Sequence, residues 1–299
     1  MSDVREKFAL VLVLWGSRYG AVHVNTLAEA AFQHSPNLDE VVVLTDHPRE
    51  GIDARVTQRP FPPPYNEAEF FGFGYRAKLA VFAAISATPG KPCVFLDLDS
   101  IVLGDLGRIA RLVQGPDDLF LLPPAGLRFS RLRRWLDRIR GNRRFPVGNS
   151  SVMAFHSAAS PNLSGLYARL RAEGHLTEGW EAQIDDILIS HFGRGRIRAV
   201  PTDVAVMLRR EFLSRVPFWP SVKTLLPNVR RRRSLIAAVT LNGVAVKPET
   251  LAALPEGADL GDGKGRHGRW DAGGFGQLWL PMVQACGTLA SWQTDAKSD

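Results

Sequence analysis

Two carboxylates stand two residues apart inside an apolar stretch, and their type and spacing are suited to binding a metal ion. Residues 94–103 are apolar except for Asp97, Asp99 and Ser100. Burying paired carboxylates is costly unless a positive charge meets them. On an extended chain, side chains two residues apart point to the same side, so we expect both carboxylates to converge on one ion. Oxygen ligands favour Mg²⁺ or Mn²⁺, and such an ion commonly also binds the phosphate groups of a ligand.

The elements that must position these carboxylates alternate between apolar strands and helices. Continuous apolar runs are typical of strands buried on both faces of a sheet, and apolar residues at helical spacing indicate helices. Strands are expected at 8–15, 41–45, 93–98, 119–122 and 152–155, and helices at 21–32, 75–87, 160–173 and 178–192. This alternation predicts a doubly wound α/β sheet.

The C-terminal third follows a different pattern. From about residue 201 the sequence is irregular and basic, with one further strand expected at 236–241. No internal repeat or low-complexity linker divides the chain. We therefore expect one continuous domain over 1–256, and a Gly-rich tail over 257–299 that packs on or near the site.

The composition is that of an ordinary globular protein and excludes several classes. Of the 299 residues, 45% are hydrophobic and 22% charged, and no apolar run approaches the roughly 20 residues of a membrane-spanning helix. Cys93 and Cys286 are the two cysteines, too few for a disulfide framework or a cysteine zinc site. The polar N-terminus lacks the pattern of a signal peptide. These features predict a cytoplasmic location.

A glycine pattern at 72–77 imitates a dinucleotide-binding fingerprint. Gly72-Phe73-Gly74-Tyr75-Arg76-Ala77 fits G-x-G-x-x-A. The fingerprint requires a strand directly before its first glycine, so that the turn can place a pyrophosphate on a helix N-terminus. Residues 60–71 contain four prolines and two glutamates, which do not suit a strand. The pattern is therefore interpreted as a loop that enters the next helix.

Several motifs around the carboxylate pair carry a resemblance to a known family. Tyr-Arg-Ala-Lys-Leu at 75–79 precedes the pair, and Gly-Asp-Leu at 104–106 follows it. Asn-Ser-Ser-Val at 149–152 and Glu-Ala-Gln-Ile-Asp-Asp at 181–186 come later. With Asp-x-Asp at 97–99, this order resembles the GT-A-fold glycosyltransferases, most closely the family 8 (nucleotide-diphospho-sugar transferase) branch. The resemblance implies a Rossmann-related mixed sheet with helices on both faces and an elaborated basic C-terminal part.

The same resemblance implies roles for individual residues. It makes residues 1–256 a GT-A-like catalytic domain, in which Asp97 and Asp99 hold Mn²⁺ or Mg²⁺ against the phosphates of a sugar nucleotide. The implied donor-binding residues are Trp15, Gly16, Arg76, Lys78, Asp97, Asn149, Ser150 and Lys247. The implied catalytic residues are Gln183, Asp185 and Asp186. Read without the family, Asp97 and Asp99 suit the turn after a strand, Asn149 suits a turn, and the other charged residues suit solvent.

The third metal ligand departs from the family pattern. Metal-dependent members supply a histidine in a His-Gly…Lys-Pro setting, whereas this chain has Asn242-Gly243 before Lys247-Pro248. An amide oxygen is a weaker ligand than imidazole for Mn²⁺. His267, from the tail, is the alternative, so the third ligand is expected to be Asn242 or His267.

The positive charge is concentrated in two segments. Residues 128–144 hold eight arginines and one aspartate, and residues 209–233 hold seven arginines, one lysine and one glutamate. Each segment thus carries +7, equal to the net charge of the whole chain. Aromatic and aliphatic residues alternate with the arginines, as in helices that lie on an anionic membrane surface. The alternative is packing on the domain itself, and no nucleic-acid recognition motif is present.

Together these observations predict a metal-dependent glycosyltransferase. Its partners would be a nucleotide-sugar donor, a glycan or lipid-linked acceptor and an anionic membrane surface, with a role in surface polysaccharide assembly. A GT-A-like nucleotidyltransferase is the first alternative, although residues 16–20 are too short and too aromatic for the Gly-rich phosphate loop it needs. A non-catalytic member that binds glycan or membrane is the second.

Overall fold

The structure, a computed structural model, accounts for most of the chain. It describes residues 6–71, 76–83, 90–123, 148–158, 163–174, 185–193, 195–216 and 218–270. Four of the predicted features lie outside these ranges: the basic segment 128–144, the glycines at 72 and 74, Gln183, and the tail beyond residue 270.

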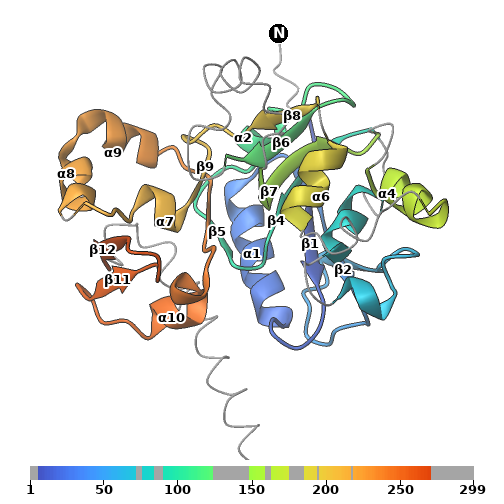
Figure 1. The fold of residues 1–299 in the computed structure, drawn as a ribbon, viewed down its shortest axis with the longest axis horizontal. Coiled ribbons are helices and arrows are strands. Elements are labelled where there is room, and N and C mark those ends of the chain that lie inside the picture. Colours follow the sequence, from blue (N-terminus) through green and yellow to red (C-terminus); the bar gives the residue numbers. More distant parts are fainter. Residues whose placement is uncertain are drawn as a thin grey trace, which may run out of the picture.

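A seven-stranded mixed sheet forms the centre of the molecule (Figure 1). Its strands are β1 (Phe8–Leu14), β2 (Leu38–Thr45), β3 (Val56–Pro60), β4 (Pro92–Leu96), β6 (Leu119–Leu122), β7 (Asn149–His156) and β8 (Ile197–Ala199). They lie in the order β3-β2-β1-β4-β7-β6-β8. All neighbours pair in parallel except β7, which is antiparallel to both β4 and β6. The mixed sheet implied by the family resemblance is confirmed.

The continuous apolar runs explain why both faces of this sheet are covered. Along β1, Phe8, Leu10, Leu12 and Leu14 belong to one hydrophobic core, and Ala9, Val11 and Val13 belong to the other. Successive side chains of a strand point to opposite faces, so a run with no polar residue buries both. Helix α1 (Ala21–His34) packs on the first face and helix α6 (Asp185–Phe192) on the second.

A second, smaller sheet carries the chain away from the centre. It consists of β5 (Ser100–Val102), β10 (Ala238–Thr240) and β9 (Ala205–Met207), with β10 in the middle. A separate hairpin joins β11 (Asp259–Gly261) to β12 (His267–Arg269). The segment from α7 to β12 lies on one side of the molecule, and α4 and α6 lie on the other (Figure 1). This arrangement puts the irregular C-terminal part beside the central sheet.

The remaining helices are short. They are α2 (Gly107–Ala110), α4 (Leu163–Ala172), α7 (Leu208–Glu211), α8 (Trp219–Leu225), α9 (Pro227–Arg233), α10 (Pro248–Ala252) and the 3₁₀ turns η1 (Ala68–Phe70), η2 (Arg76–Phe82) and η3 (Val244–Val246). No helix within the described ranges has the length and apolarity needed to cross a membrane.

One predicted helix has a different form. The expected α-helix at 75–87 is a 3₁₀ helix over Arg76–Phe82, the part of it with assigned helical structure. All six residues from Ala77 to Phe82 are buried. A helix surrounded by the core on every side has no solvent face, so packing, and not the 3.6-residue period, sets its winding.

Candidate functional site

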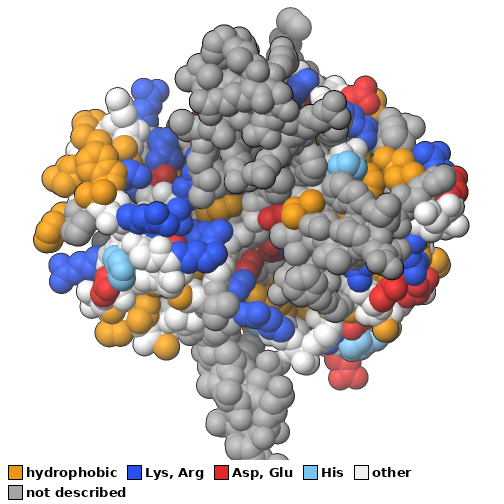
Figure 2. Space-filling model, viewed as in Figure 1, with side chains coloured by type: hydrophobic (Ala, Val, Ile, Leu, Met, Phe, Trp, Pro, Cys, Tyr) orange, Lys and Arg blue, Asp and Glu red, His pale blue; other side chains and the backbone are white. Residues whose placement is uncertain are grey.

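Several element ends meet at one edge of the central sheet and enclose a pocket of about 430 Å³. Trp15 follows the carboxyl end of β1, and Asp97 follows that of β4. Asn149 begins β7, which runs the opposite way, so its amino end reaches the same edge. The second sheet adds Asn242, which follows β10. In this face of the molecule, acidic side chains lie inside a hollow with basic side chains beside them (Figure 2).

The carboxylate pair lies in the turn that links the two sheets. The Ser100 N–H donates to the Asp97 carbonyl over 3.0 Å, and the Leu241 N–H donates to the Asp99 carbonyl over 2.9 Å. The strand was predicted to extend to residue 98 with both aspartates on extended chain, but β4 ends at Leu96 and the chain turns before β5, as in the alternative reading of Asp97 and Asp99 as turn residues. Both residues nevertheless line the pocket, because the turn itself forms part of its wall.

Lys78 neutralises one side of the site. Its Nζ lies 2.8 Å from Asp97 Oδ1 and 3.0 Å from Asp185 Oδ2. Burial alone would lower the pKa of Lys78, but the carboxylates of Asp185 and Asp97 outweigh that effect and raise the pKa above its ordinary value. The ammonium therefore stays charged at neutral pH. It holds together a residue of the β4–β5 turn and a residue of α6.

Lys247 neutralises the other side through an ion pair with Asp99 Oδ2. Asp99 is 6% exposed, and its Oδ1 accepts no hydrogen bond within the described part of the chain. A buried carboxylate oxygen without a donor is unfavourable unless a cation or solvent meets it. The free oxygen of Asp99 is thus a ready ligand position.

The opposite wall is a network of hydroxyl, amide and carboxyl groups. The Ser150 Oγ donates to Asp185 Oδ2 and the Ser150 N–H to Asp186 Oδ1, each over 2.6 Å. The Asn149 Nδ2 also donates to Asp186, over 3.2 Å. Burial, together with the neighbouring Asp185 carboxylate, raises the pKa of Asp186. Such a wall offers the donors and acceptors that sugar hydroxyls need.

Of the two candidate third ligands, the structure brings only Asn242 to the pocket. The Asn242 Nδ2 donates to Asn149 Oδ1 over 3.2 Å and to Ser151 Oγ over 2.7 Å. His267 lies on β12, where its Nδ1 is 3.2 Å from Asp259 and its side chain is 62% exposed. The two aspartates and the Asn242 amide supply oxygen donors, which suit Mg²⁺ or Mn²⁺. Within the described residues no cluster of three or more His, Cys, Asp or Glu is arranged to hold a metal.

Aromatic residues line the side of the pocket next to β1. Trp15 and Tyr19 belong to the lining, together with Arg18, whose guanidinium lies 5.5 Å from the Tyr19 ring centroid. Gly16 forms the turn between them in a left-handed conformation (φ 64°), which glycine tolerates best. The Gly16 N–H donates to Asp46 over 3.0 Å. Planar rings beside a guanidinium can accept a base by stacking.

Two predicted donor residues are not part of the lining. Arg76 donates to the Glu69 carbonyl over 3.1 Å and lies against the Phe70 ring, on the far side of η2 from Lys78. Gly16 forms the turn between Trp15 and Arg18 but does not itself line the pocket. Gln183 lies outside the described residues. The predicted donor roles of Arg76 and Gly16 therefore remain predictions, without a contact to the pocket.

Sequence reasoning omitted some of the lining. Ser151, Gly243, Arg18 and Tyr19 all border the pocket but were not among the predicted site residues, although the family resemblance places residues 15–19 near the nucleotide base and ribose. Arg18 and Tyr19 follow Trp15 directly, so the aromatic and basic content after the first strand was an available signal. Ser151 had no such signal, because only the tertiary contact with Asn242 brings it to the site.

Comparison with solved structures identifies the architecture. No protein-family model and no curated protein sequence matches this chain. The galactosyltransferase LgtC, solved with donor and acceptor sugar analogues, superposes with a TM-score of 0.52 at 15% identity, covering 80% of this chain and 88% of LgtC. The chain has the GT-A fold. The GT-A folded bifunctional glycosyltransferase WbbM gives a TM-score of 0.56 at 13% identity over 93% of this chain, which spans about half of WbbM (51%).

The predicted fold class is thereby confirmed, whereas the family 8 branch stays a prediction. In this GT-A fold, the described pocket lies where the carboxyl ends of parallel strands meet. Open α/β sheets bind ligands at that edge.

Proposed function

We propose that this protein is a glycosyltransferase that moves a sugar from a nucleotide-diphosphate donor to a glycan or lipid-linked acceptor. The observation that carries the proposal is the pocket, in which the Asp97–Asp99 turn faces a wall of sugar-binding type across two lysines. The glycosyltransferases LgtC and WbbM, which share the fold, support it.

The proposed donor site divides into three parts. Trp15, Arg18 and Tyr19 would hold the nucleoside by stacking and by charge. The ammonium groups of Lys78 and Lys247 would bind the diphosphate, which becomes more negative as the glycosidic bond breaks. Both lysines are already held by buried carboxylates, so little reorganisation is needed when the charge develops.

The sugar would lie against the polar wall. Asn149 and Ser150 present an amide and a hydroxyl from the start of β7, and Asp185 and Asp186 present carboxylates from the start of α6. Hydrogen bonds from fixed groups hold the anomeric carbon in the orientation needed for attack. They also reject a sugar whose hydroxyls point elsewhere, because buried polar groups would be left unpaired.

A divalent cation fits the residues present. Asp97, Asp99 and Asn242 would hold Mg²⁺ or Mn²⁺ through oxygen atoms, with the unpaired Oδ1 of Asp99 as the clearest ligand position. When bound, the cation would neutralise charge on the leaving diphosphate. Metal dependence is part of the proposal.

A thermal-shift screen of nucleoside diphosphates, with and without Mn²⁺, tests the donor and metal assignments. A ligand at 100 times its dissociation constant adds about 2.7 kcal/mol to the free energy of unfolding. We expect Asp99→Asn to lose the metal-dependent part of the shift. Asp105→Asn is the matched control, because the Asp105 carboxylate pairs with Arg111 and does not border the pocket. No metal-dependent shift with any nucleotide, and no difference between the two variants, would refute the proposal.

Slow hydrolysis of a sugar nucleotide in the absence of acceptor tests catalysis separately from binding. A glycosyltransferase is expected to release the nucleoside diphosphate, whereas a nucleotidyltransferase releases pyrophosphate when given a nucleoside triphosphate and a sugar phosphate. Binding without release of either product would identify a non-catalytic member of the fold.

We further propose that the protein docks on an anionic membrane, where a lipid-linked acceptor would be present. All seven large hydrophobic side chains that are exposed in the described part of the chain lie between Val216 and Leu235. Phe218 is 83% exposed and Leu225 is 73% exposed. Helices α8 and α9 have no buried residue, and hydrophobic side chains gather at the edge of the molecule where α8 lies (Figure 2).

The charge of the same segment suits an anionic surface. Arg230 and Arg231 are exposed on α9, next to the apolar side chains of α8. Basic residues beside exposed aromatic and aliphatic ones are typical of interfacial helices. The proposed docking segment is therefore 216–235, which overlaps most of the predicted segment 209–233. The proposed location is the inner face of the plasma membrane, in surface polysaccharide assembly.

Flotation with vesicles of anionic or zwitterionic lipid tests the docking. We expect salt-sensitive binding to anionic vesicles, weakened by Phe218→Ser/Leu225→Ser and by Arg230→Gln/Arg231→Gln. Lys264→Gln, an exposed charge on the β11–β12 turn, is the control. Absence of salt-sensitive binding, or equal binding to neutral vesicles, would refute it.

A further inference from the structure

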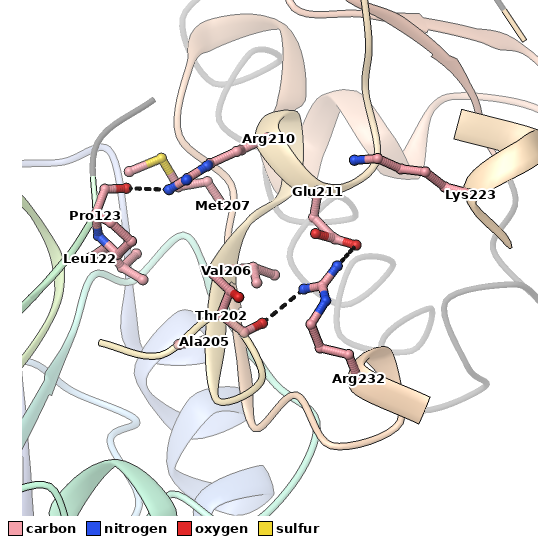
Figure 3. A pocket seen from close by; sticks show the side chains of 10 residues that line it. All are labelled: Leu122, Pro123, Thr202, Ala205, Val206, Met207, Arg210, Glu211, Lys223 and Arg232. Atoms are coloured by element: carbon pink, nitrogen blue, oxygen red, sulfur yellow. Dashed lines mark hydrogen bonds and ion pairs between the residues drawn. The ribbon is translucent and has the colours of Figure 1, made fainter. Parts of the chain in front are cut away.

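A second pocket, of about 220 Å³, lies beside the proposed donor site and has no role in the proposals above. Its charged lining residues are Arg210 from α7, Glu211 from α7, Lys223 from α8 and Arg232 from α9. Leu122, Val206 and Met207 form an apolar part of the wall. Three cations and one carboxylate therefore face the same small cavity (Figure 3).

The one carboxylate is already neutralised. Glu211 is 7% exposed, and its Oε1 accepts hydrogen bonds from Arg232 and, over 2.8 Å, from Arg233. The Arg232 Nη1 also donates to the Thr202 carbonyl over 2.9 Å. These contacts attach α9 to α7 and give Arg232 a structural role. Glu211 is thus paired with two arginines, and the group of three side chains keeps a net positive charge.

Arg210 and Lys223 have no such partner. The Arg210 Nη1 donates to the Pro123 carbonyl over 2.9 Å, and no carboxylate of the described chain lies within ion-pair distance of its guanidinium. Burial, and the neighbouring Arg232 and Arg266, lower the pKa of Arg210 in spite of Glu211. Lys223 is half-buried and forms no ion pair within the described ranges, and its side chain extends from α8 toward the cavity (Figure 3).

The pocket is next to the proposed sugar wall. Leu122, in its lining, is paired across the sheet with Asn149. Met207, also in its lining, is paired with Thr240, whose hydroxyl donates to Asn242 over 2.7 Å. Paired strands lie about 5 Å apart. The second pocket is thus lined in part by strands that pair directly with the strands next to the donor pocket.

From these contacts we propose that the second pocket binds an oxyanion, a phosphate or a carboxylate, carried by the acceptor. Arg210 and Lys223 are the recognising residues, and the acceptor is accordingly an anionic glycan or a phosphate-linked one. A cavity of about 220 Å³ suits a single anionic group on a sugar. The acceptor part of this proposal rests on the proposed glycosyltransferase function; the oxyanion site does not.

Isothermal titration of the full-length protein with methyl phosphate and, separately, with glucuronate tests the site. Both carry the proposed charge, and the comparison of the two separates a phosphate from a carboxylate ligand. We expect saturable 1:1 binding that weakens with salt. Arg210→Gln/Lys223→Gln is expected to weaken it at least tenfold. Arg230→Gln/Arg231→Gln removes the same charge from exposed positions of the same region and is expected to change it less than twofold.

Two results would overturn the proposal. The first is that neither probe binds saturably. The second is that both double variants weaken binding equally, which would mean diffuse attraction to a basic surface. If the first double variant does not fold, Lys223→Gln alone is expected to weaken binding at least threefold, because Lys223 makes no ion pair with the described chain that its loss would break.

The two proposals fail in distinguishable ways. Nucleoside diphosphate shifts should be the same in Arg210→Gln/Lys223→Gln and in the native protein, since neither residue borders the donor pocket. Binding of methyl phosphate here, with no nucleoside diphosphate bound anywhere, would refute the glycosyltransferase proposal and leave the oxyanion site intact. Nucleotide binding without methyl phosphate binding would refute the oxyanion site alone.

Discussion

Replacing Lys78 by methionine removes the ammonium that lies between the carboxylates of Asp97 and Asp185. The side chains of Lys78, Asp97 and Asp185 are 10%, 17% and 7% exposed, so water can replace little of the lost interaction. Removing one partner of a buried ion pair costs about 3–5 kcal/mol, because a buried charge is left uncompensated. Asp97 is the more accessible of the two carboxylates, which favours the lower part of that range. Methionine keeps most of the side-chain volume, so the loss measures charge and not packing.

Chemical denaturation and thermal melting, followed over pH, provide the assay. A loss of that size lowers the melting temperature by roughly 6–15 °C. The pKa of Lys78 is raised in the folded state by the carboxylates beside it, so the stability that Lys78 contributes is fully present at neutral pH. The deficit of the variant relative to the native protein is therefore full at neutral pH and shrinks only at alkaline pH, as Lys78 of the native protein loses its proton. A divalent cation should stabilise the variant more than the native protein, because the site has lost one positive charge.

Lys91→Met is the matched control. The side chain of Lys91, like that of Lys78, is 10% exposed. It also pairs with acidic side chains, those of Asp39 and Glu40, but at the opposite end of β4. It is expected to lose stability without a greater response to Mg²⁺ or Mn²⁺. A loss below about 1 kcal/mol in Lys78→Met, or an equal metal response in both variants, would refute the assignment of Lys78 as the cation of the carboxylate site.

Two further predictions concern the same pocket, and a third concerns the neighbouring strand pair β6–β7. Asp186→Asn should be at least as stable as the native protein near neutral pH, because burial and Asp185 raise the pKa of Asp186, and the gain should vanish toward low pH in denaturation experiments. In hydrolysis assays its donor turnover should fall at least tenfold. Asn242→His should raise the Mn²⁺:Mg²⁺ affinity ratio about tenfold in calorimetric titrations, since imidazole prefers the softer ion; an unchanged ratio would argue against residue 242 as a ligand. Gly148→Ala should cost about 1–3 kcal/mol by denaturation, because the new Cβ would lie 2.5 Å from the Leu121 side chain; an unaffected stability would mean that β6 and β7 can separate there.

The class of the central sheet follows from local patterns in the sequence. The apolar runs at 8–14 and 41–44 contain no polar residue, which indicates strands covered on both faces, as in parallel sheets. It also predicted that Asp97 and Asp99 belong to a site, since two carboxylates inside an apolar segment are tolerated only where cations or a ligand meet them. Both residues line the described pocket. Periodicity and burial cost act along the chain, and a sequence records them directly.

Which groups meet across the site depends on the tertiary structure. Lys78 contacts Asp97 and Asp185, whereas Arg76, two residues earlier on η2, contacts Glu69, because the packing of η2 turns only Lys78 toward the pocket. The pairing of Arg232 with Glu211, which leaves Arg210 without a carboxylate partner in the described chain, depends on how α9 folds back on α7. Contacts between distant elements depend on sheet order and packing, which the spacing of residues in a sequence does not record.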